Sequence, residues 1–229
     1  MILILRDSCF LRNKCAKYKS GKCTEDFCVK LFKENEIYDK GLFSNTQRVS
    51  IPLYIDKDGT DSEQFRRLQN IELDVENFVK SGVNLYLHSC RCGNGKTSWA
   101  LRIAQAYVDR VWYKCDMSCK VLFISVPKFL ILLKDNISSK NEYITHIKDV
   151  VADCDLVIWD DIGTKAGTEF EIENMLNIID NRLCNGKSNI YTSNLRSNEL
   201  LDSVGPRLHS RIVNKSVDIE LMGSDKRGV

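Results

Sequence analysis

The residues from Leu87 to Ser98, LHSCRCGNGKTS, have the side-chain types and spacing of a loop that binds phosphate groups. They nearly match the pattern G-x-x-x-x-G-K-[ST], in which backbone N–H groups and one lysine surround the phosphates of a nucleotide. Gly93 and Gly95 allow the backbone to approach these phosphates closely, and Lys96 is expected to reach the β- and γ-phosphates. The sequence therefore predicts a binding site for a nucleoside triphosphate.

The same segment supplies an expected contact to Mg²⁺. Thr97 is expected to ligate the ion through its hydroxyl group, at the start of a helix whose positive dipole end favours phosphate. The first glycine of the pattern is replaced by Cys90, which suits the loop only while its φ stays negative. The residues predicted to bind nucleotide here are Cys92, Gly93, Asn94, Gly95, Lys96, Thr97 and Ser98.

Two adjacent carboxylates follow an apolar run further along the chain. The run LVIW leads directly into Asp160 and Asp161. At the end of a buried strand, Asp160 is expected to hold Mg²⁺ together with Thr97. Asp161 is expected to act as the general base that orients and polarises the attacking water. A solvated strand end that carries two acidic residues is the alternative interpretation.

A third polar position follows the next apolar run, where the sequence reads IYTSNL. Asn194 stands at the tip of this predicted strand. Its side chain is expected to lie beside the γ-phosphate and to help hold the attacking water. An asparagine that only forms a turn after the strand is the alternative.

Ten cysteines are present, and four lie close together near the start of the chain: Cys9, Cys15, Cys23 and Cys28. The sequence shows no secretion signal and no membrane-spanning run, so reduced thiols in a cytoplasmic protein are expected. Four thiolates suffice for a structural zinc site, which would stabilise a small module without a large core. The spacing contains no C-x₂-C pair, so an iron–sulfur cluster and metal-free thiols stay open as alternatives.

The elements that position these residues follow from the hydrophobic pattern. Short apolar runs predict strands, and apolar residues at three- and four-residue spacing predict helices between them, with Asp61 as a candidate N-cap. The predicted strands cover residues 83–87, 120–126, 155–159, 188–192 and 216–221, and the predicted helices residues 61–82, 97–112, 127–136, 141–152 and 170–183. Strands that are apolar on both faces and alternate with helices indicate an α/β fold with a parallel sheet.

Composition divides the chain of 229 residues into three regions. Residues 1–50 form the predicted cysteine-rich module, residues 51–60 a linker, and residues 61–229 the nucleotide-binding domain. The formal net charge of +2 excludes a strongly basic protein that coats nucleic acid. Any contact with DNA is therefore expected to come from a local patch.

Taken together and in this order, the motifs resemble those of AAA+ ATPases. More narrowly, the segments GNGKTS, IWDDIG, YTSNL and GPRLHSRI resemble those of DnaC/DnaI-type helicase loaders and of the related IstB transposition ATPases. The resemblance covers residues from about 60 to 229. It implies a P-loop NTPase core, with a parallel sheet of five strands and helices on both faces, and suggests a phage or mobile-element origin.

The resemblance also assigns roles to three arginines. Arg211 matches the arginine finger that acts on the nucleotide of a neighbouring subunit, and Arg207 matches a supporting residue. Arg227 matches the sensor-2 arginine, and because it lies close to the end of the sequence, little or no helical lid is expected. A trans-acting finger implies ATP-dependent self-assembly. A solvated basic helix is the alternative for Arg207 and Arg211.

The function implied by the resemblance is loading of a DnaB-type replicative helicase onto single-stranded DNA, with slow, Mg²⁺-dependent ATP hydrolysis. The expected partners are that helicase, single-stranded DNA and further copies of the chain, with no membrane. An IstB-like accessory ATPase of transposition shares every motif. A non-catalytic adaptor that holds ATP as a structural ligand is a third possibility.

Overall fold

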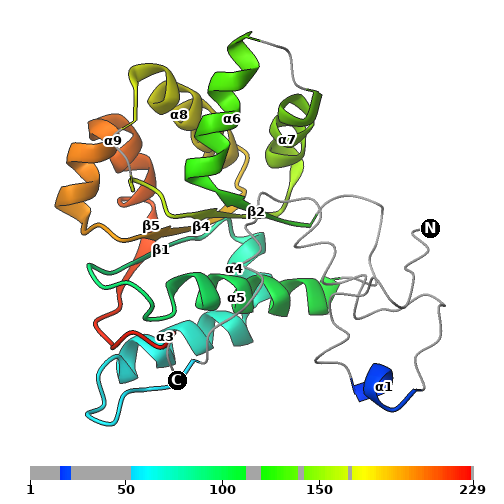
Figure 1. Ribbon diagram of the computed structural model, residues 1–229, viewed down its shortest axis with the longest axis vertical. Coiled ribbons are helices and arrows are strands. Elements are labelled where there is room, and N and C mark those ends of the chain that lie inside the picture. Colours follow the sequence, from blue (N-terminus) through cyan, green and yellow to red (C-terminus); the bar gives the residue numbers. More distant parts are fainter. Residues whose placement is uncertain (1–15, 22–52, 112–119, 139–141, 165–166, 228–229) are drawn as a thin grey trace.

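The computed structural model describes residues 16–21, 53–111, 120–138, 142–164 and 167–227. Apart from the short helix α1 (Ala16–Lys19), these residues form one sheet covered by helices on both faces (Figure 1). The fold is therefore the predicted α/β fold of a P-loop NTPase.

The sheet has five strands in the order β2-β3-β4-β1-β5, and every described pair of neighbours is parallel. The strands are β1 (Asn84–His88), β2 (Val121–Ser125), β3 (Leu156–Asp160), β4 (Ser188–Ser193) and β5 (Ser216–Glu220). The side chains of β1 to β4 are buried along their whole length. Because β1 lies between β4 and β5, the carboxyl ends of β3, β4 and β1 are neighbours at one edge of the sheet, where ligands bind in open parallel sheets.

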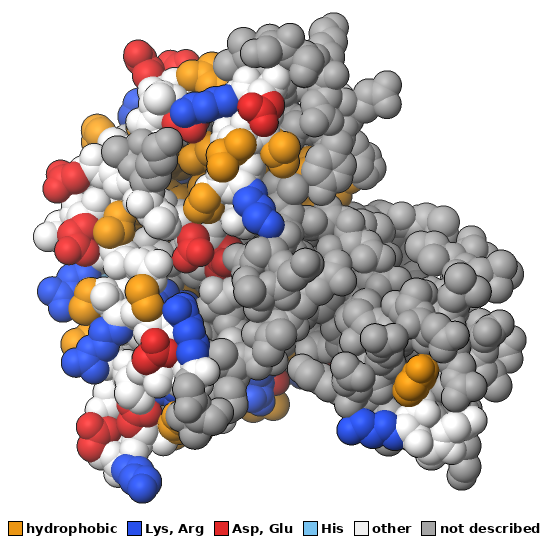
Figure 2. All heavy atoms as spheres, viewed as in Figure 1, with side chains coloured by type: hydrophobic (Ala, Val, Ile, Leu, Met, Phe, Trp, Pro, Cys, Tyr) orange, Lys and Arg blue, Asp and Glu red, His pale blue; other side chains and the backbone are white. Residues whose placement is uncertain are grey.

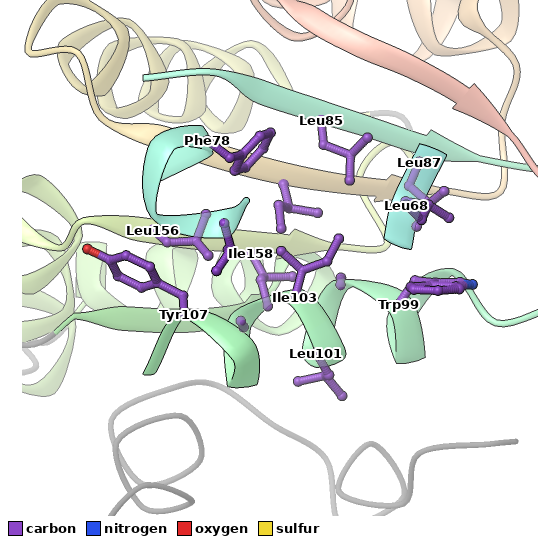
Figure 3. Packing of buried hydrophobic residues seen from close by; sticks show 14 of the residues in the cluster. Leu68, Phe78, Leu85, Leu87, Trp99, Leu101, Ile103, Tyr107, Leu156 and Ile158 are labelled. Carbon is purple, nitrogen blue, oxygen red and sulfur yellow. The ribbon is translucent and has the colours of Figure 1, made fainter. Parts of the chain in front are cut away.

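Helices cover both faces of this sheet (Figure 1). On one face lie α3 (Ser62–Leu73), α4 (Val75–Lys80) and α5 (Lys96–Val111), and on the other α6 (Val126–Ser138), α7 (Glu142–Asp153), α8 (Glu169–Cys184) and α9 (Ser197–Ile212). In the first layer, Leu68 and Phe78 meet Trp99 and Ile103 of α5 beneath the apolar strand residues (Figure 3). This packing fixes the start of α5, and with it the loop that precedes this helix.

The predicted helix over residues 61–82 is two helices in the structure. The break lies at Asp74, whose φ of −110° and ψ of 32° are not helical. Its carboxylate accepts a hydrogen bond of 2.7 Å from Nδ2 of Asn77. Aspartate favours such local bonds over helix propagation, which explains why the helix ends here.

A second break divides α9, where Gly205 has a φ of 76° and is followed by Pro206. Proline disfavours a helical conformation of the preceding residue, and glycine adopts positive φ without steric cost. The half of α9 after this kink carries Arg207 and Arg211, one turn apart.

The surface of the described residues is mixed in charge. On the face shown in Figure 2, acidic and basic side chains are interspersed, in line with the small net charge. Among the described helices, none combines the length and hydrophobicity needed to cross a bilayer.

Candidate nucleotide-binding site

The loop between β1 and α5, residues 89–95, has the backbone of a phosphate-binding loop and is called the phosphate loop below. Gly93 has a φ of 74° and Gly95 a φ of 107°, conformations that favour glycine. Among the described non-glycine residues, only Asp61 and Asp161 have positive φ. Cys90 therefore meets the condition under which it can replace the first glycine of the motif.

Lys96 is the first residue of α5, and its side chain is only 6% exposed. Its Nζ donates hydrogen bonds of 2.8 Å to the carbonyl oxygen of Arg91 and 3.3 Å to Oδ1 of Asn94. Burial lowers the pKa of Lys96, while the nearby carboxylates of Asp161 and Asp160 oppose this shift. A buried ammonium group that bonds to neutral oxygens is suited to an anionic ligand such as a phosphate.

The two predicted magnesium ligands are in contact. The hydroxyl group of Thr97 donates a hydrogen bond of 2.8 Å to Oδ1 of Asp160, which is 1% exposed. A carboxylate and a hydroxyl oxygen, facing each other beside the phosphate loop, are oxygen donors of the kind Mg²⁺ prefers. The donor set thus fits the predicted ion.

Thr192 is a residue of the site that the sequence analysis missed. From β4, its buried hydroxyl group donates a hydrogen bond of 2.7 Å to Oδ1 of Asp160 and accepts one of 3.1 Å from the backbone N–H of Asp161. Its carbonyl oxygen also accepts a hydrogen bond of 2.9 Å from the N–H of Ile162. A threonine in a buried strand carries no sequence signal that separates this role from ordinary packing.

Asp161 turns away from β3 in a left-handed conformation, with a φ of 60°. Its Oδ1 accepts a hydrogen bond of 3.4 Å from Nδ2 of Asn194, so the structure brings these two predicted catalytic residues together. Burial raises the pKa of Asp161, and the charges of Lys96 and Arg227 partly offset this effect. A carboxylate with a raised pKa is a better proton acceptor near neutral pH than an ordinary aspartate.

Asn94 and Ser98 are buried, whereas Cys92 is exposed. Nδ2 of Asn94 donates to Oγ of Ser89 at 2.7 Å and to the carbonyl oxygen of Leu221 at 3.0 Å. The Asn94 side chain therefore stabilises the loop itself. Only the backbone N–H of Asn94 is then expected to contact a nucleotide.

Arg207 and Arg211 lie elsewhere, in a groove of about 330 Å³ between α8 and α9. The residues that line this groove are Leu176, Asn177, Asp180, Pro206, Arg207, Ser210 and Arg211, so no residue of the phosphate loop takes part. Nε of Arg211 forms an ion pair with Oδ1 of Asp180 on α8. Both arginines thus belong to a surface separate from the chain's own phosphate loop.

Arg227 is exposed and lies in the extended segment that follows β5. Its positive charge lowers the pKa of both Lys96 and Asp161, which places it within electrostatic reach of the site. Among the described residues, which end at Arg227, no helix follows β5.

The predicted zinc ligands Cys9, Cys15, Cys23 and Cys28 lie outside the described residues. Within the part of the chain that the structure describes, no cluster of three or more His, Cys, Asp or Glu side chains is arranged to hold a metal ion.

The same fold occurs in proteins of DNA replication. The DnaC helicase loader superposes with a TM-score of 0.61 at 19% identity, over 78% of this chain and 99% of that chain. DnaI superposes with a TM-score of 0.65 at 20% identity, over 85% and 99%. The replication initiator DnaA, bound to AMPPCP and single-stranded DNA, gives 0.57 at 18% identity, over 76% of this chain and 49% of that chain. No curated protein matches the chain significantly in sequence.

Together, the parallel sheet, the phosphate loop and the carboxylates beyond β3 define an AAA+ P-loop protein that binds ATP. The IstB-like ATP-binding protein family matches residues 54–209, from the predicted linker through the phosphate loop to α9. The chain belongs to this family.

Proposed function

We propose that the protein is an ATPase that loads a DnaB-type replicative helicase onto single-stranded DNA. The observation that carries this proposal is the similarity in fold to the DnaC helicase loader and to DnaI. It extends over 99% of the DnaC chain and 99% of the DnaI chain. The helicase-loading role belongs by name to DnaC, and its transfer to this chain is the proposal.

The chemistry proposed for the site is hydrolysis of the γ-phosphate. Lys96 and the N–H groups of the phosphate loop bind the phosphates, and Thr97 with Asp160 would hold Mg²⁺, which neutralises phosphate charge when bound. Asp161 accepts a proton from the attacking water, and Asn194 orients that water together with Asp161. The water oxygen bonds to the γ-phosphorus as the bond to the β–γ bridging oxygen breaks, and ADP and phosphate leave.

Self-assembly is proposed because Arg211 is remote from its own phosphate loop. In an assembly, the groove between α8 and α9 would face the nucleotide of a neighbouring copy. Arg211 would then exchange Asp180 for the phosphate charge that develops during hydrolysis, a contact worth ~10³–10⁵ in rate where it has been measured. Arg207 would support it from the preceding turn.

Contact with single-stranded DNA is proposed as modest and dependent on nucleotide, because the net charge of the chain is only +2. Support comes from the similarity to DnaA bound to single-stranded DNA. A cytoplasmic location is part of the same proposal. The four cysteines of residues 1–50 are proposed to bind one zinc ion and to stabilise a module that contacts the helicase.

A second candidate is an accessory ATPase of transposition, favoured by the match to the IstB-like family itself. It would use the same residues for ATP and would differ in its protein partner. A non-catalytic adaptor differs from both, because its ATP would not be turned over.

The deciding experiment is affinity capture with the full chain, with ATP and without it, from the host that carries its gene. We expect a DnaB-type replicative helicase to be retained with ATP, and lost with a Lys96→Ala variant that cannot bind nucleotide. Capture of a transposase instead would select the second candidate. Hydrolysis that is undetectable at every protein concentration would select the adaptor.

A further inference from the structure

The segment that follows β5, residues 221–227, runs along the phosphate loop and is called the tail. It begins as a continuation of the sheet, because the N–H of Leu221 donates to the carbonyl oxygen of His88 at 2.9 Å. The carbonyl oxygen of Leu221 accepts from Asn94 at 3.0 Å, and that of Met222 accepts from Nη1 of Arg91 at 2.9 Å. The start of the tail is thus bonded to side chains of the phosphate loop.

The end of the tail contacts Gly93 of the phosphate loop. The N–H of Lys226 donates a hydrogen bond of 2.9 Å to the carbonyl oxygen of Gly93. The carboxylate of Asp225 lies so close to Gly93 that a Cβ there would stand 1.8 Å from its Oδ1. Both ends of the tail therefore restrict the conformation of the phosphate loop.

The tail is held in turn by Asp61, the residue before α3. Asp61 occupies the predicted N-cap position, but its carboxylate makes no capping bond to that helix. The carboxylate instead accepts hydrogen bonds from the N–H groups of Met222 at 2.8 Å and Gly223 at 2.7 Å. Asp61 is 7% exposed and has a φ of 67°, an unfavourable conformation for aspartate that these contacts offset. A Cβ at Gly223 would lie 2.8 Å from Oδ2 of Asp61, so only glycine fits this junction without displacement.

A second junction joins the tail to residues 53–60. Asp56 accepts hydrogen bonds from the N–H of Ser224 at 2.7 Å and from Nζ of Lys226 at 3.1 Å. The Lys226 side chain is 1% exposed and its Nζ lies 4.9 Å from the ring centroid of Tyr54. The hydrogen bond from Ser224, followed by that from Lys226, holds the pKa of Asp56 below its usual value. Residues 53–61 and the phosphate loop thus both bond to the tail, which lies next to α3 (Figure 1).

We propose that Asp61 is a positioning residue for nucleotide binding. It acts through the backbone of the tail, which sets the phosphate loop in the conformation that accepts phosphates. Residues 53–61 hold the tail, and the tail in turn holds the phosphate loop. The inference rests on the proposed function, since it requires that the loop bind ATP.

The test compares the Asp61→Asn and Gly223→Ala variants in titrations with a fluorescent ATP analogue. An asparagine side chain offers one acceptor where the carboxylate offers two, and the alanine Cβ displaces the same carboxylate. Each variant should bind the analogue roughly 10-fold more weakly, the loss expected for one hydrogen bond to a charged group. Both substitutions disrupt the same contact, between Asp61 and the tail. The double variant should therefore bind the analogue with the same affinity as the single variant that binds it less tightly.

The matched control is Asp58→Asn, in the same segment, because the described hydrogen bonds of Asp58 stay within its own turn, to Thr60 and to its own backbone, and none reaches the tail. It should bind like wild type. The number of sites in the titration separates positioning from loss of structure: misfolding lowers the stoichiometry, whereas a mispositioned loop raises Kd at unchanged stoichiometry. If Asp61→Asn does not fold, Asp56→Asn tests the neighbouring junction. A loss of roughly 10-fold is expected there as well, because the buried ammonium group of Lys226 loses its charged partner.

The proposal is overturned if Asp61→Asn and Gly223→Ala, at full stoichiometry, bind like wild type, or if their effects add in the double variant. A Lys96→Ala variant measured alongside separates this failure from failure of the proposed function. Unchanged binding in Lys96→Ala would refute the nucleotide site itself, whereas lost binding there with normal binding in the junction variants would refute only the role of Asp61.

Discussion

Thr192 on β4 and Asp160 at the end of β3 are joined by a hydrogen bond of 2.7 Å, which the threonine hydroxyl donates to Oδ1. The same carboxylate oxygen accepts the hydroxyl of Thr97 from α5 at 2.8 Å. Since the Thr192 oxygen also accepts the N–H of Asp161, one side chain orients both neighbouring acidic residues. The geometry of the acidic pair is therefore set from the adjacent strand.

Replacing Thr192 with valine keeps the shape of the side chain but removes the hydroxyl group. We expect the Mg²⁺ concentration needed for ATP binding to rise roughly 10-fold, because the Asp160 carboxylate loses one of its two hydroxyl donors. The Thr192→Ser variant keeps the hydroxyl group and should need the same Mg²⁺ concentration as wild type. The measurement is binding of a fluorescent ATP analogue over a Mg²⁺ series, and equal curves for valine and wild type would contradict the prediction.

The two acidic residues should respond differently to the same change. Asp161→Asn should retain Mg²⁺-dependent ATP binding and lose at least 10²-fold in hydrolysis rate, because an amide cannot accept the proton of the water. Asp160→Asn should instead weaken binding that depends on Mg²⁺. Binding titrations and phosphate release measured on both variants test this division of roles, which is wrong if the two variants behave alike.

Asp161 also predicts how stability depends on pH. Its pKa is raised in the folded protein, chiefly by burial, so the folded state holds the proton more tightly than the unfolded chain does. Its contribution to stability is then most favourable at low pH and is lost as the pH rises through the raised pKa. Asp161→Asn should therefore have a higher Tm than wild type at pH 7, with the difference shrinking on acidification. Thermal unfolding without nucleotide measures this. A lower Tm for the variant at pH 7 would argue against a half-buried carboxylate that destabilises the folded protein when it is ionised.

Arg211→Ala should bind ATP normally and hydrolyse it at least 10²-fold more slowly, because the lost contact is made to a neighbouring subunit. An Arg211→Ala subunit keeps its own Lys96 and Asp161, and a Lys96→Ala subunit keeps its finger. Mixing the two variants should therefore recover part of the hydrolysis rate. If the mixture stays inactive although each variant assembles with wild type, Arg211 is not a trans-acting finger. It would then be an ordinary surface residue of a solvated basic helix.

The purified protein should contain about one zinc ion per chain, by the ligand count of a structural site. Serine at any of Cys9, Cys15, Cys23 and Cys28 should lower the metal content and leave ATP binding intact. Metal analysis by mass spectrometry checks this. Full zinc occupancy in a chain that begins at Thr60 would place the metal elsewhere.

The sequence alone was sufficient for features whose cause is local. The glycines of the phosphate loop, the apolar run before Asp160 and the alternation of strands with helices each follow from backbone freedom or from burial of neighbouring residues. For that reason the fold class, the five strands and the position of the loop between a strand and a helix were all predicted.

Tertiary structure alone decided the contacts between residues far apart in the chain. Thr192 reaches Asp160 because β4 lies beside β3, and Arg211 reaches Asp180 because α9 packs on α8. Asp61, which reads as a helix cap in sequence, accepts its hydrogen bonds from Met222 and Gly223 instead. A polar side chain takes whichever partner the packed chain brings within reach, and only the strand order and the return of the chain past the loop determine which partner that is.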